Sequence, residues 1–203
     1  MYRDKHATIT PGDHIVEQAC HSVDKLVWAL GDQDPVSAIA HGGRQQRVES
    51  QYGNIYDHFS VVYDFPGGER GFLFCRQMEN CTGSNDDYIM GSKGCAKIQA
   101  FGNLEITGEN PWRLTKRTGA DMYQQEHNEL FASIRKGEAK NDGEQMMRST
   151  LMAIMGRESA YTGRRLSWED IKTSEQKLMP ENLSWDMELP EPPIPMPGRT
   201  EFI

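Results

Sequence analysis

The stretch from Tyr56 to Gln77 constrains the fold more than any other part of the sequence. Residues 56–65 alternate between apolar and more polar side chains, with one face made of Phe59, Val61, Tyr63 and Phe65. A period of two is typical of a strand that buries one face. A Pro-Gly-Gly turn follows at 66–68, and GFLFCRQ at 71–77 supplies a second strand. The sequence therefore predicts a β-hairpin.

The other periodic segments extend this hairpin into a sheet covered by helices. RRLSWED at 164–170 is typical of a short edge strand or turn, and four more strands are predicted at 36–40, 87–91, 95–99 and 103–107. Helical periodicity predicts three helices, at 13–30, 121–136 and 143–162. Short connections favour antiparallel pairing. The predicted fold is α+β, an open, mostly antiparallel mixed β-sheet with helices packed on one face.

Proline content divides the chain into a domain at 1–178 and a tail at 179–203. The tail contains PENLSWDMELPEPPIPMPGRT, whose prolines exclude regular structure. We expect it to wrap over the domain as an extended strap, anchored by Trp185 and Leu189. On the apolar stripe of the helix at 121–136, His127 is expected to be a buried core histidine.

Charge and composition exclude several classes of partner. The net charge of −8 argues against nonspecific nucleic-acid binding. No apolar run approaches the roughly 20 residues that cross a bilayer, so no membrane partner is expected. The N-terminus MYRDKHATITPG lacks the apolar core of a signal peptide, which favours a cytoplasmic address for this chain. The four cysteines lack CxxC spacing and are expected to be reduced thiols, although a Cys75–Cys81 bridge stays open.

Three ionisable side chains follow each other at helical spacing in GDHIVEQACHSVD. Glu17, His21 and Asp24 fall on one face of the predicted helix at 13–30, beside its apolar stripe. One interpretation is a solvated polar face. A metal site is another, but His14 and His21 are separated by about 10.5 Å of helix rise, too far for both to bind one zinc. Glu17 and His21 would need outside ligands, and no metal site is predicted.

Several segments of the sequence resemble a known protein family. Glu17, His21 and Asp24, followed by Trp28 and Gly31, resemble D-x-x-x-H-x-x-D…W…G, which opens the C-terminal domain of the glucose–fructose oxidoreductase / inositol dehydrogenase (Gfo/Idh/MocA) family. Four later segments resemble the same domain in the same order: GNIYDHFSVVYDFPGG, MGSKGCAKI, YQQEHNELFASIRKGE and MRSTLMAIMGRESAYTGRRLSW. The resemblance covers about residues 12–170.

The resemblance implies the second half of an NAD(P)-dependent sugar or polyol dehydrogenase. Its Rossmann domain, with the lysine of an EKP motif, would be supplied in cis or in trans. NAD or NADP would serve the complete enzyme, whereas this chain alone should bind neither, because none of its glycine clusters fits GxGxxG. The family's sheet face commonly forms a homo-oligomer interface. An export signal ahead of the Rossmann half would make the protein periplasmic.

The resemblance also implies roles for individual residues. His21 matches the general base that removes the hydroxyl proton, and Glu17 matches an acid that orients the imidazole. The family usually has Asp at this position. Asp24 would accept a bond from a sugar hydroxyl. Further candidates for substrate binding are His14, His58 and Arg76.

The roles of two arginines stay open, and two functions other than an oxidoreductase domain remain as alternatives. In GGRQQR, Arg44 and Arg47 would reach substrate or a neighbouring subunit, or would lie on the surface. A noncatalytic module for oligomerisation or carbohydrate binding is the main alternative function. A metal-dependent hydrolase built on Glu17 and His21 is a weaker one.

Overall fold

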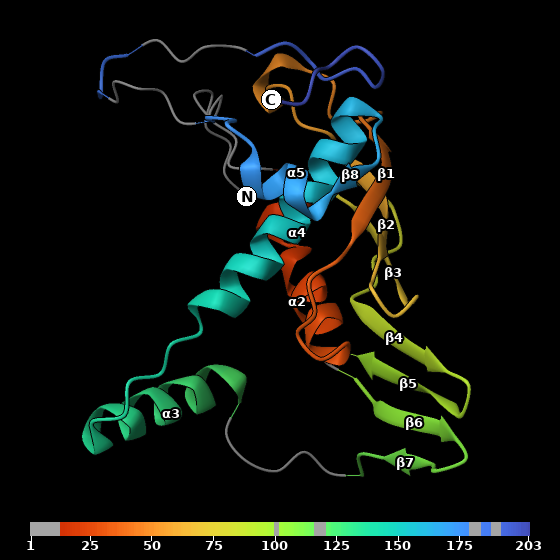
Figure 1. Cartoon of the computed structure of the whole chain (residues 1–203), viewed down its shortest axis with the longest axis vertical. Coiled ribbons are helices and arrows are strands. Elements are labelled where there is room, and N and C mark those ends of the chain that lie inside the picture. Colours follow the sequence, from red (N-terminus) through yellow and green to blue (C-terminus); the bar gives the residue numbers. More distant parts are fainter. Residues whose placement is uncertain (1–12, 100–101, 116–120, 179–183, 188–191) are drawn as a thin grey trace. The chain divides into compact units, whose positions relative to one another are not determined.

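The computed structural model describes residues 13–99, 102–115, 121–178, 184–187 and 192–203, and these fall into two compact units. The first unit comprises Met1–Cys81 and Gln145–Ile203, and the second comprises Thr82–Glu144. Elements of the first unit are α1 (Asp13–Glu17), α2 (Cys20–Ala29), β1 (Ser37–Gly43), η1 (Ser50–Tyr52), β2 (His58–Asp64), β3 (Arg70–Arg76), α4 (Gly143–Thr162), β8 (Leu166–Ser167) and α5 (Trp168–Thr173) (Figure 1). The second unit contains β4 (Asp86–Gly91), β5 (Gly94–Gln99), β6 (Leu104–Gly108), β7 (Trp112–Arg113) and α3 (Met122–Lys136).

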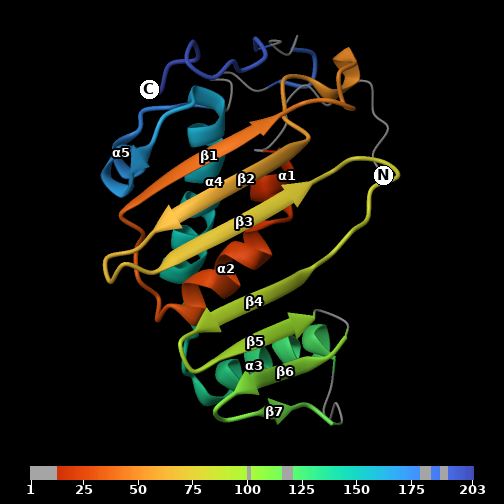
Figure 2. The ribbon, with the colours of Figure 1, turned by 90° about the vertical axis from the view of Figure 1, so that its right-hand side faces the viewer.

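The first unit is built on an antiparallel sheet in the order β3-β2-β1-β8. Its helices α2 and α4 lie behind one face of the sheet, and the other face is open toward the viewer in Figure 2. Along β2 buried and half-buried side chains alternate, and the buried ones are Phe59, Val61 and Tyr63. This is the alternation that the sequence predicts.

The core of the first unit lies between the sheet and the helices. The largest fully buried side chains come from both layers: Ile15, Val23, Val27, Val61, Tyr63, Met152, Met155 and Leu166. Helix α4 approaches β2 closely at Gly156, where a Cβ atom would lie 2.8 Å from the Tyr63 hydroxyl. That hydroxyl donates a hydrogen bond to the Met152 carbonyl at 2.9 Å. The contact fixes α4 on the sheet, and α4 in turn holds α1 and α2.

The second unit has an antiparallel sheet in the order β4-β5-β6-β7 and one helix. Helix α3 begins after Asp121, whose carboxylate accepts the Gln124 N–H at 3.0 Å, and ends at Gly137 in the left-handed conformation. Five of its apolar side chains are 46% to 67% exposed, namely Met122, Tyr123, Leu130, Phe131 and Ile134. The prediction that His127 is a core residue is wrong: it is exposed, and its Nδ1 lies 2.7 Å from the Tyr123 carbonyl oxygen.

The predicted open, antiparallel α+β fold is confirmed, with three corrections. The strands form two four-stranded sheets instead of one, and within the described residues every strand pair is antiparallel, so the sheets are not mixed. The helix predicted at 13–30 is interrupted at Gln18 and Ala19. Trp185 is fully exposed and does not anchor the tail, and Leu189 lies outside the described residues.

Other parts of the C-terminal segment contact the first unit. The Tyr56 hydroxyl donates to the Pro195 carbonyl at 2.9 Å, and the Gly198 N–H donates to the Thr162 carbonyl at 2.8 Å. The division of the chain after residue 178 stays a prediction. All four cysteines are free, so Cys75 and Cys81 are not bridged. Among the described helices, none is both long and apolar enough to cross a membrane.

Candidate functional site

The candidate site begins at the interruption between α1 and α2. The His14 carbonyl oxygen accepts two hydrogen bonds, from the Gln18 N–H at 2.9 Å and from the Ala19 N–H at 3.0 Å. The second bond spans five residues, which is the pattern of a single π turn inside an α-helix. Such turns occur frequently at functional sites. The turn spans His14 to Ala19, so it contains Glu17 and ends two residues before His21, the two residues that the sequence motif proposes for the chemistry.

Glu17 and His21 both present exposed side chains. Within the described part of the chain, neither side chain has a hydrogen-bond or ion-pair partner. The continuous-helix spacing that predicted a shared face does not apply, because α1 ends at Glu17 and α2 begins at Cys20. Both groups are nevertheless open to a reactant, and neither is sealed under the sheet.

Asp24 has a different environment from the other two. Its carboxylate accepts a hydrogen bond from the Ser149 hydroxyl at 2.6 Å and bonds from the Gln145 amide at 3.1 Å to each oxygen. Both partners belong to the first unit and lie on α4. Asp24 therefore ties α2 to α4, a role that the sequence did not predict.

His14 is buried, with 4% of its surface exposed, and its ring packs 5.3 Å from the Phe59 ring between centroids. Neither ring nitrogen has a hydrogen-bond partner in good geometry, although the Cys75 backbone lies nearby. Burial lowers the pKa of His14, and the positive charge of Arg47 lowers it further. An unpartnered buried imidazole is costly and is an unusual feature of a folded chain.

His58 and the buried Asp57 form a dyad at the start of β2. The Asp57 Oδ1 atom lies 2.8 Å from His58 Nδ1, and its Oδ2 atom accepts the backbone N–H groups of Gln45, Gln46 and Arg47 at 2.7, 2.7 and 3.1 Å. Burial alone would raise the pKa of Asp57. The hydrogen bonds from His58 and from the three backbone amides outweigh burial and lower the pKa to about 2.

Two further predicted residues, His58 and Arg76, lie on the open face of the first sheet. His58 pairs with Arg76 and with Gly43 across the strands, so His58 and Arg76 belong to the open face. Phe59 and the buried Asp57 belong to the face that the helices cover. The structure thus does not bring His58 and Arg76 to the same face as His14.

One buried acidic group was not predicted as a functional residue. Asp13 has φ of 62° and is buried, and its Oδ2 atom accepts the Tyr161 hydroxyl at 2.5 Å. Burial raises the pKa of Asp13 to about 6, against the opposing effects of the Tyr161 hydrogen bond and the Arg157 charge. No local signal in the sequence indicates that Tyr161 is the partner of Asp13, because the two residues lie far apart in the chain.

The raised pKa of Asp13 predicts a specific pH dependence of stability. Between about pH 4 and pH 6 the folded chain holds a proton that the unfolded chain has released, so stability falls as the pH rises, by about 3 kcal/mol in all. Asp13→Asn should remove this loss and be more stable than the parent at pH 8. Urea denaturation at both ends of the range measures the effect. Asp186→Asn, at an exposed carboxylate, is the control. If the free energy of unfolding changes equally with pH in all three proteins, the prediction is wrong.

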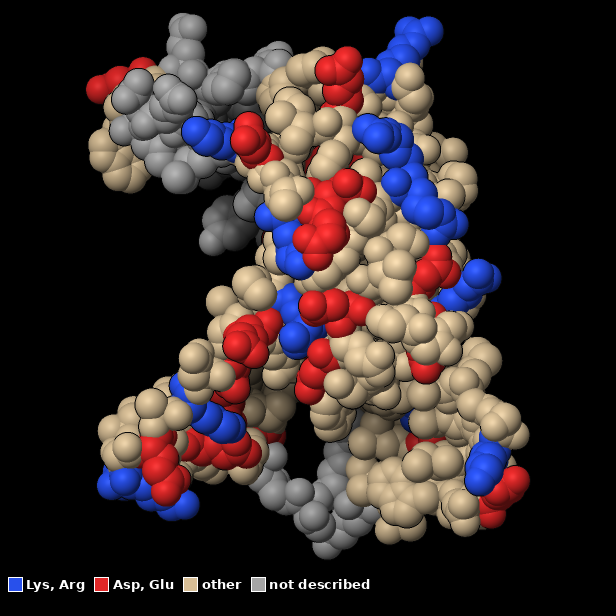
Figure 3. Space-filling model, in the orientation of Figure 1, with Lys and Arg blue, Asp and Glu red and all other residues tan. Residues whose placement is uncertain are grey.

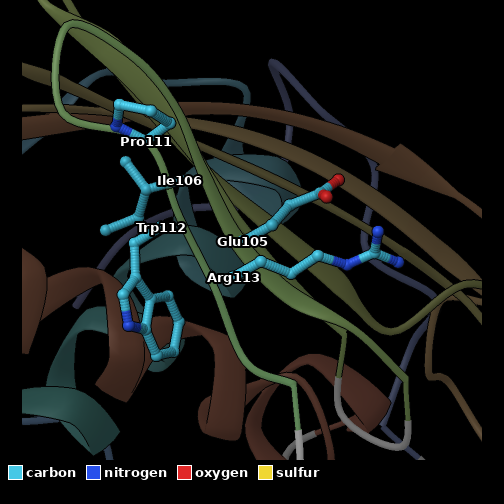
Figure 4. A pocket seen from close by; sticks show the side chains of 5 residues that line it. All are labelled: Glu105, Ile106, Pro111, Trp112 and Arg113. Atoms are coloured by element: carbon cyan, nitrogen blue, oxygen red, sulfur yellow. The ribbon is translucent and has the colours of Figure 1, made fainter.

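The described residues of a single chain offer no metal site, and their described hollow lies in the second unit. None of their His, Cys, Asp and Glu side chains gather in groups of three or more that could hold a metal ion. A shallow hollow of about 250 Å³ lies between β6 and β7 and is lined by Glu105, Ile106, Pro111, Trp112 and Arg113 (Figure 4). Register places Ile106 beside Trp112 and Glu105 beside Arg113, on opposite faces. Figure 3 shows acidic and basic side chains interspersed over the face in view.

Comparisons with known proteins identify solved structures with a similar fold. No protein-family model and no curated protein matches the sequence. Solved structures do match. UDP-N-acetylglucosamine 3-dehydrogenase from Acidithiobacillus ferrooxidans superposes with a TM-score of 0.61 at 17% identity, over 72% of this chain and 46% of that one. Aldose-aldose oxidoreductase from Caulobacter crescentus, complexed with glycerol, gives 0.59 at 16% identity, over 78% and 51%. A dehydrogenase from Bordetella pertussis, in complex with NADH and UDP-GlcNAcA, gives 0.54 at 17%, over 74% and 43%.

These matches establish the fold. The chain has the fold of the C-terminal domain of Gfo/Idh/MocA-type oxidoreductases, as the sequence motifs indicated. It spans about half the length of the solved structures that it matches.

Proposed function

We propose that this chain is the substrate-binding half of an NAD(P)-dependent sugar or polyol oxidoreductase. A Rossmann domain, in the same polypeptide or in a second one, would hold the nicotinamide. The observation that carries the proposal is the position of Glu17 and His21: they are exposed, free of partners among the described residues, and located at the π turn of a domain with the oxidoreductase fold. Neighbours of this fold act on or bind aldoses, UDP-sugars and NADH.

In the proposed reaction His21 is the general base. Oxidation of a carbinol requires that a hydride leaves carbon while a proton leaves oxygen, and an imidazole accepts that proton near neutral pH. A nicotinamide held by the Rossmann domain would supply the oxidising chemistry. Glu17 orients the substrate and stabilises the imidazolium that forms. Its extra methylene relative to Asp extends the reach of its carboxylate.

The other predicted contacts are assigned more narrowly. Asp24 already accepts hydrogen bonds from Ser149 and Gln145. It therefore holds α2 in place and, with it, positions His21 for the substrate. His58 and Arg76, on the open face, would serve a subunit interface more readily than a pocket beside α1.

The open face of the first sheet favours self-association. Phe72 is 61% exposed and Phe74 is 73% exposed, on adjacent outward positions of β3. Exposed apolar side chains on a sheet face are typical of an interface. This observation also favours the alternative function, a noncatalytic oligomerisation module. The two functions are compatible, since an enzyme half can also form an oligomer.

Changing these phenylalanines should weaken the oligomer. The double variant Phe72→Ser, Phe74→Ser is expected to sediment as a smaller species than the parent, because it removes the largest exposed apolar groups of this face. Analytical ultracentrifugation over a range of concentrations measures the change. Trp185→Ser, at a fully exposed aromatic residue outside the sheet, is the control. If the double variant and the parent sediment alike, this face is not the interface.

Hydrogen–deuterium exchange with a panel of sugars and polyols tests the substrate-binding role. A substrate is expected to slow exchange of amides in α1 and α2, where Glu17 and His21 lie. A nicotinamide alone should leave exchange unchanged. Protection confined to residues around Glu105 and Arg113 would instead favour a carbohydrate-binding module that uses the hollow between β6 and β7.

A further inference from the structure

His58, on the open face of the first sheet, has a ring that is held in place while its outer nitrogen is left without a partner. Its Nδ1 atom lies 2.8 Å from the Oδ1 atom of Asp57. The ring leans over β1, because a Cβ atom on Gly43 would lie 3.2 Å from His58 Cε1 and 3.5 Å from His58 Nε2. Within the described part of the chain Nε2 makes no hydrogen bond, and 34% of the side chain is exposed. This nitrogen is therefore available to a ligand.

Asp57 determines which nitrogen of His58 carries the proton. Its second carboxylate oxygen accepts the backbone N–H groups of Gln45, Gln46 and Arg47, so the carboxylate is held against the ring. These hydrogen bonds and the one from His58 lower the pKa of Asp57 to about 2, and at neutral pH the carboxylate only accepts. A neutral His58 then donates from Nδ1 and keeps a lone pair on Nε2. Metal-binding histidines almost always have such a group behind them, a carboxylate or a carbonyl that fixes the ring.

A second histidine lies on the same face of the sheet. Gly43 is opposite His58 in the pairing of β1 with β2. His41 precedes Gly43 by two residues, so its side chain projects from the same face and is the diagonal neighbour of His58. It is exposed, and its side chain has no partner among the described residues. Diagonal neighbours have Cβ atoms about 7 Å apart, a distance that two imidazole rings and two metal–nitrogen bonds of about 2 Å can span.

We propose that His41 and His58 bind one divalent transition-metal ion, such as zinc, through an imidazole nitrogen of each. Imidazole is a preferred ligand of zinc, copper and nickel, whereas magnesium prefers oxygen ligands. Asp57 is the positioning residue behind His58. Arg76, whose positive charge would repel the ion, is opposite His58 on β3 and thus on the flank away from His41. Two imidazoles leave two positions of a tetrahedral zinc ion to water or to an outside ligand.

Calorimetric titration of the chain with zinc chloride tests the site. We expect one ion per chain, and His41→Asn and His58→Asn should each weaken binding by more than tenfold. Asp57→Asn keeps an acceptor oxygen but loses the charge that orients His58, and should weaken binding by about tenfold. The control is His127→Asn, at an exposed histidine on α3 of the second unit, and it should bind zinc as the parent does. Magnesium chloride should not compete with zinc.

The imidazole NMR signals locate the ion. Zinc should shift the signals of His41 and His58 together in the parent and leave those of His127 unchanged. In a folded His58→Asn variant, the His41 signals should respond only at higher zinc concentrations. The site is wrong if zinc does not bind, if the parent and both histidine variants bind it equally, or if other histidines respond instead. In each of these cases the proposed oxidoreductase function stands, because it depends on Glu17 and His21.

Discussion

Replacing His21 by asparagine is expected to lower the turnover of the assembled oxidoreductase by about 10²- to 10⁴-fold. Asparagine is similar in size but cannot accept the hydroxyl proton, so the loss falls on the chemical step. The variant should fold normally, because the His21 side chain is exposed and has no partner among the described residues. Steady-state kinetics with saturating sugar and nicotinamide measure the effect, and a urea denaturation curve checks the fold.

The control for this experiment is His127→Asn, at a second exposed helical histidine. It should keep full turnover. Glu17→Gln should lose less than His21→Asn, because the amide can still hydrogen-bond a substrate hydroxyl but no longer carries the charge that would stabilise an imidazolium. If His21→Asn retains the parent's turnover, His21 is not the general base.

Replacing Asp57 by alanine is expected to destabilise the chain by about 3 kcal/mol or more. The substitution leaves the N–H groups of Gln45, Gln46 and Arg47 without their acceptor, and each unsatisfied buried donor carries a desolvation cost. Asp57→Asn keeps an acceptor oxygen and should cost less. Urea denaturation at neutral pH measures both variants. A loss below about 1 kcal/mol for Asp57→Ala would mean that the loop does not depend on this carboxylate.

The pH dependence gives an independent check on Asp57. Its folded pKa of about 2 lies below the ordinary value, so the carboxylate adds stability above about pH 4. That contribution, about 2 kcal/mol, is lost as the pH falls through 2. Asp13 acts in the opposite direction, because its folded pKa is raised. The Asp57→Asn variant should therefore lose less stability than the parent in acid.

Features set by local periodicity could be predicted from the sequence. The alternation along β2 follows from the period of a strand, and Phe59, Val61 and Tyr63 are buried as expected. The ends of α3 follow from cap chemistry at Asp121 and Gly137. These signals act over a few neighbouring residues, so one sequence contains them in full.

Features set by backbone irregularity or distant partners could not be predicted. Gln18 and Ala19 are ordinary helix formers, and nothing in them indicates the π turn. The amides around the Asp57 carboxylate come from a loop that folds back from β1. The apolar stripe of α3 was predicted correctly as a pattern, but a pattern does not specify what covers it, and its residues are exposed.

Transfer of deuterium from a carbon-deuterated sugar to NAD or NADP tests directly whether this chain supplies the general base of a sugar oxidoreductase. The Rossmann domain is assayed alone, with this chain, and with the chain carrying His21→Asn. Deuterated, reduced nicotinamide is expected only when the chain is present with His21 intact. Equal transfer by the Rossmann domain alone, or by the assembly that lacks the imidazole, would contradict it.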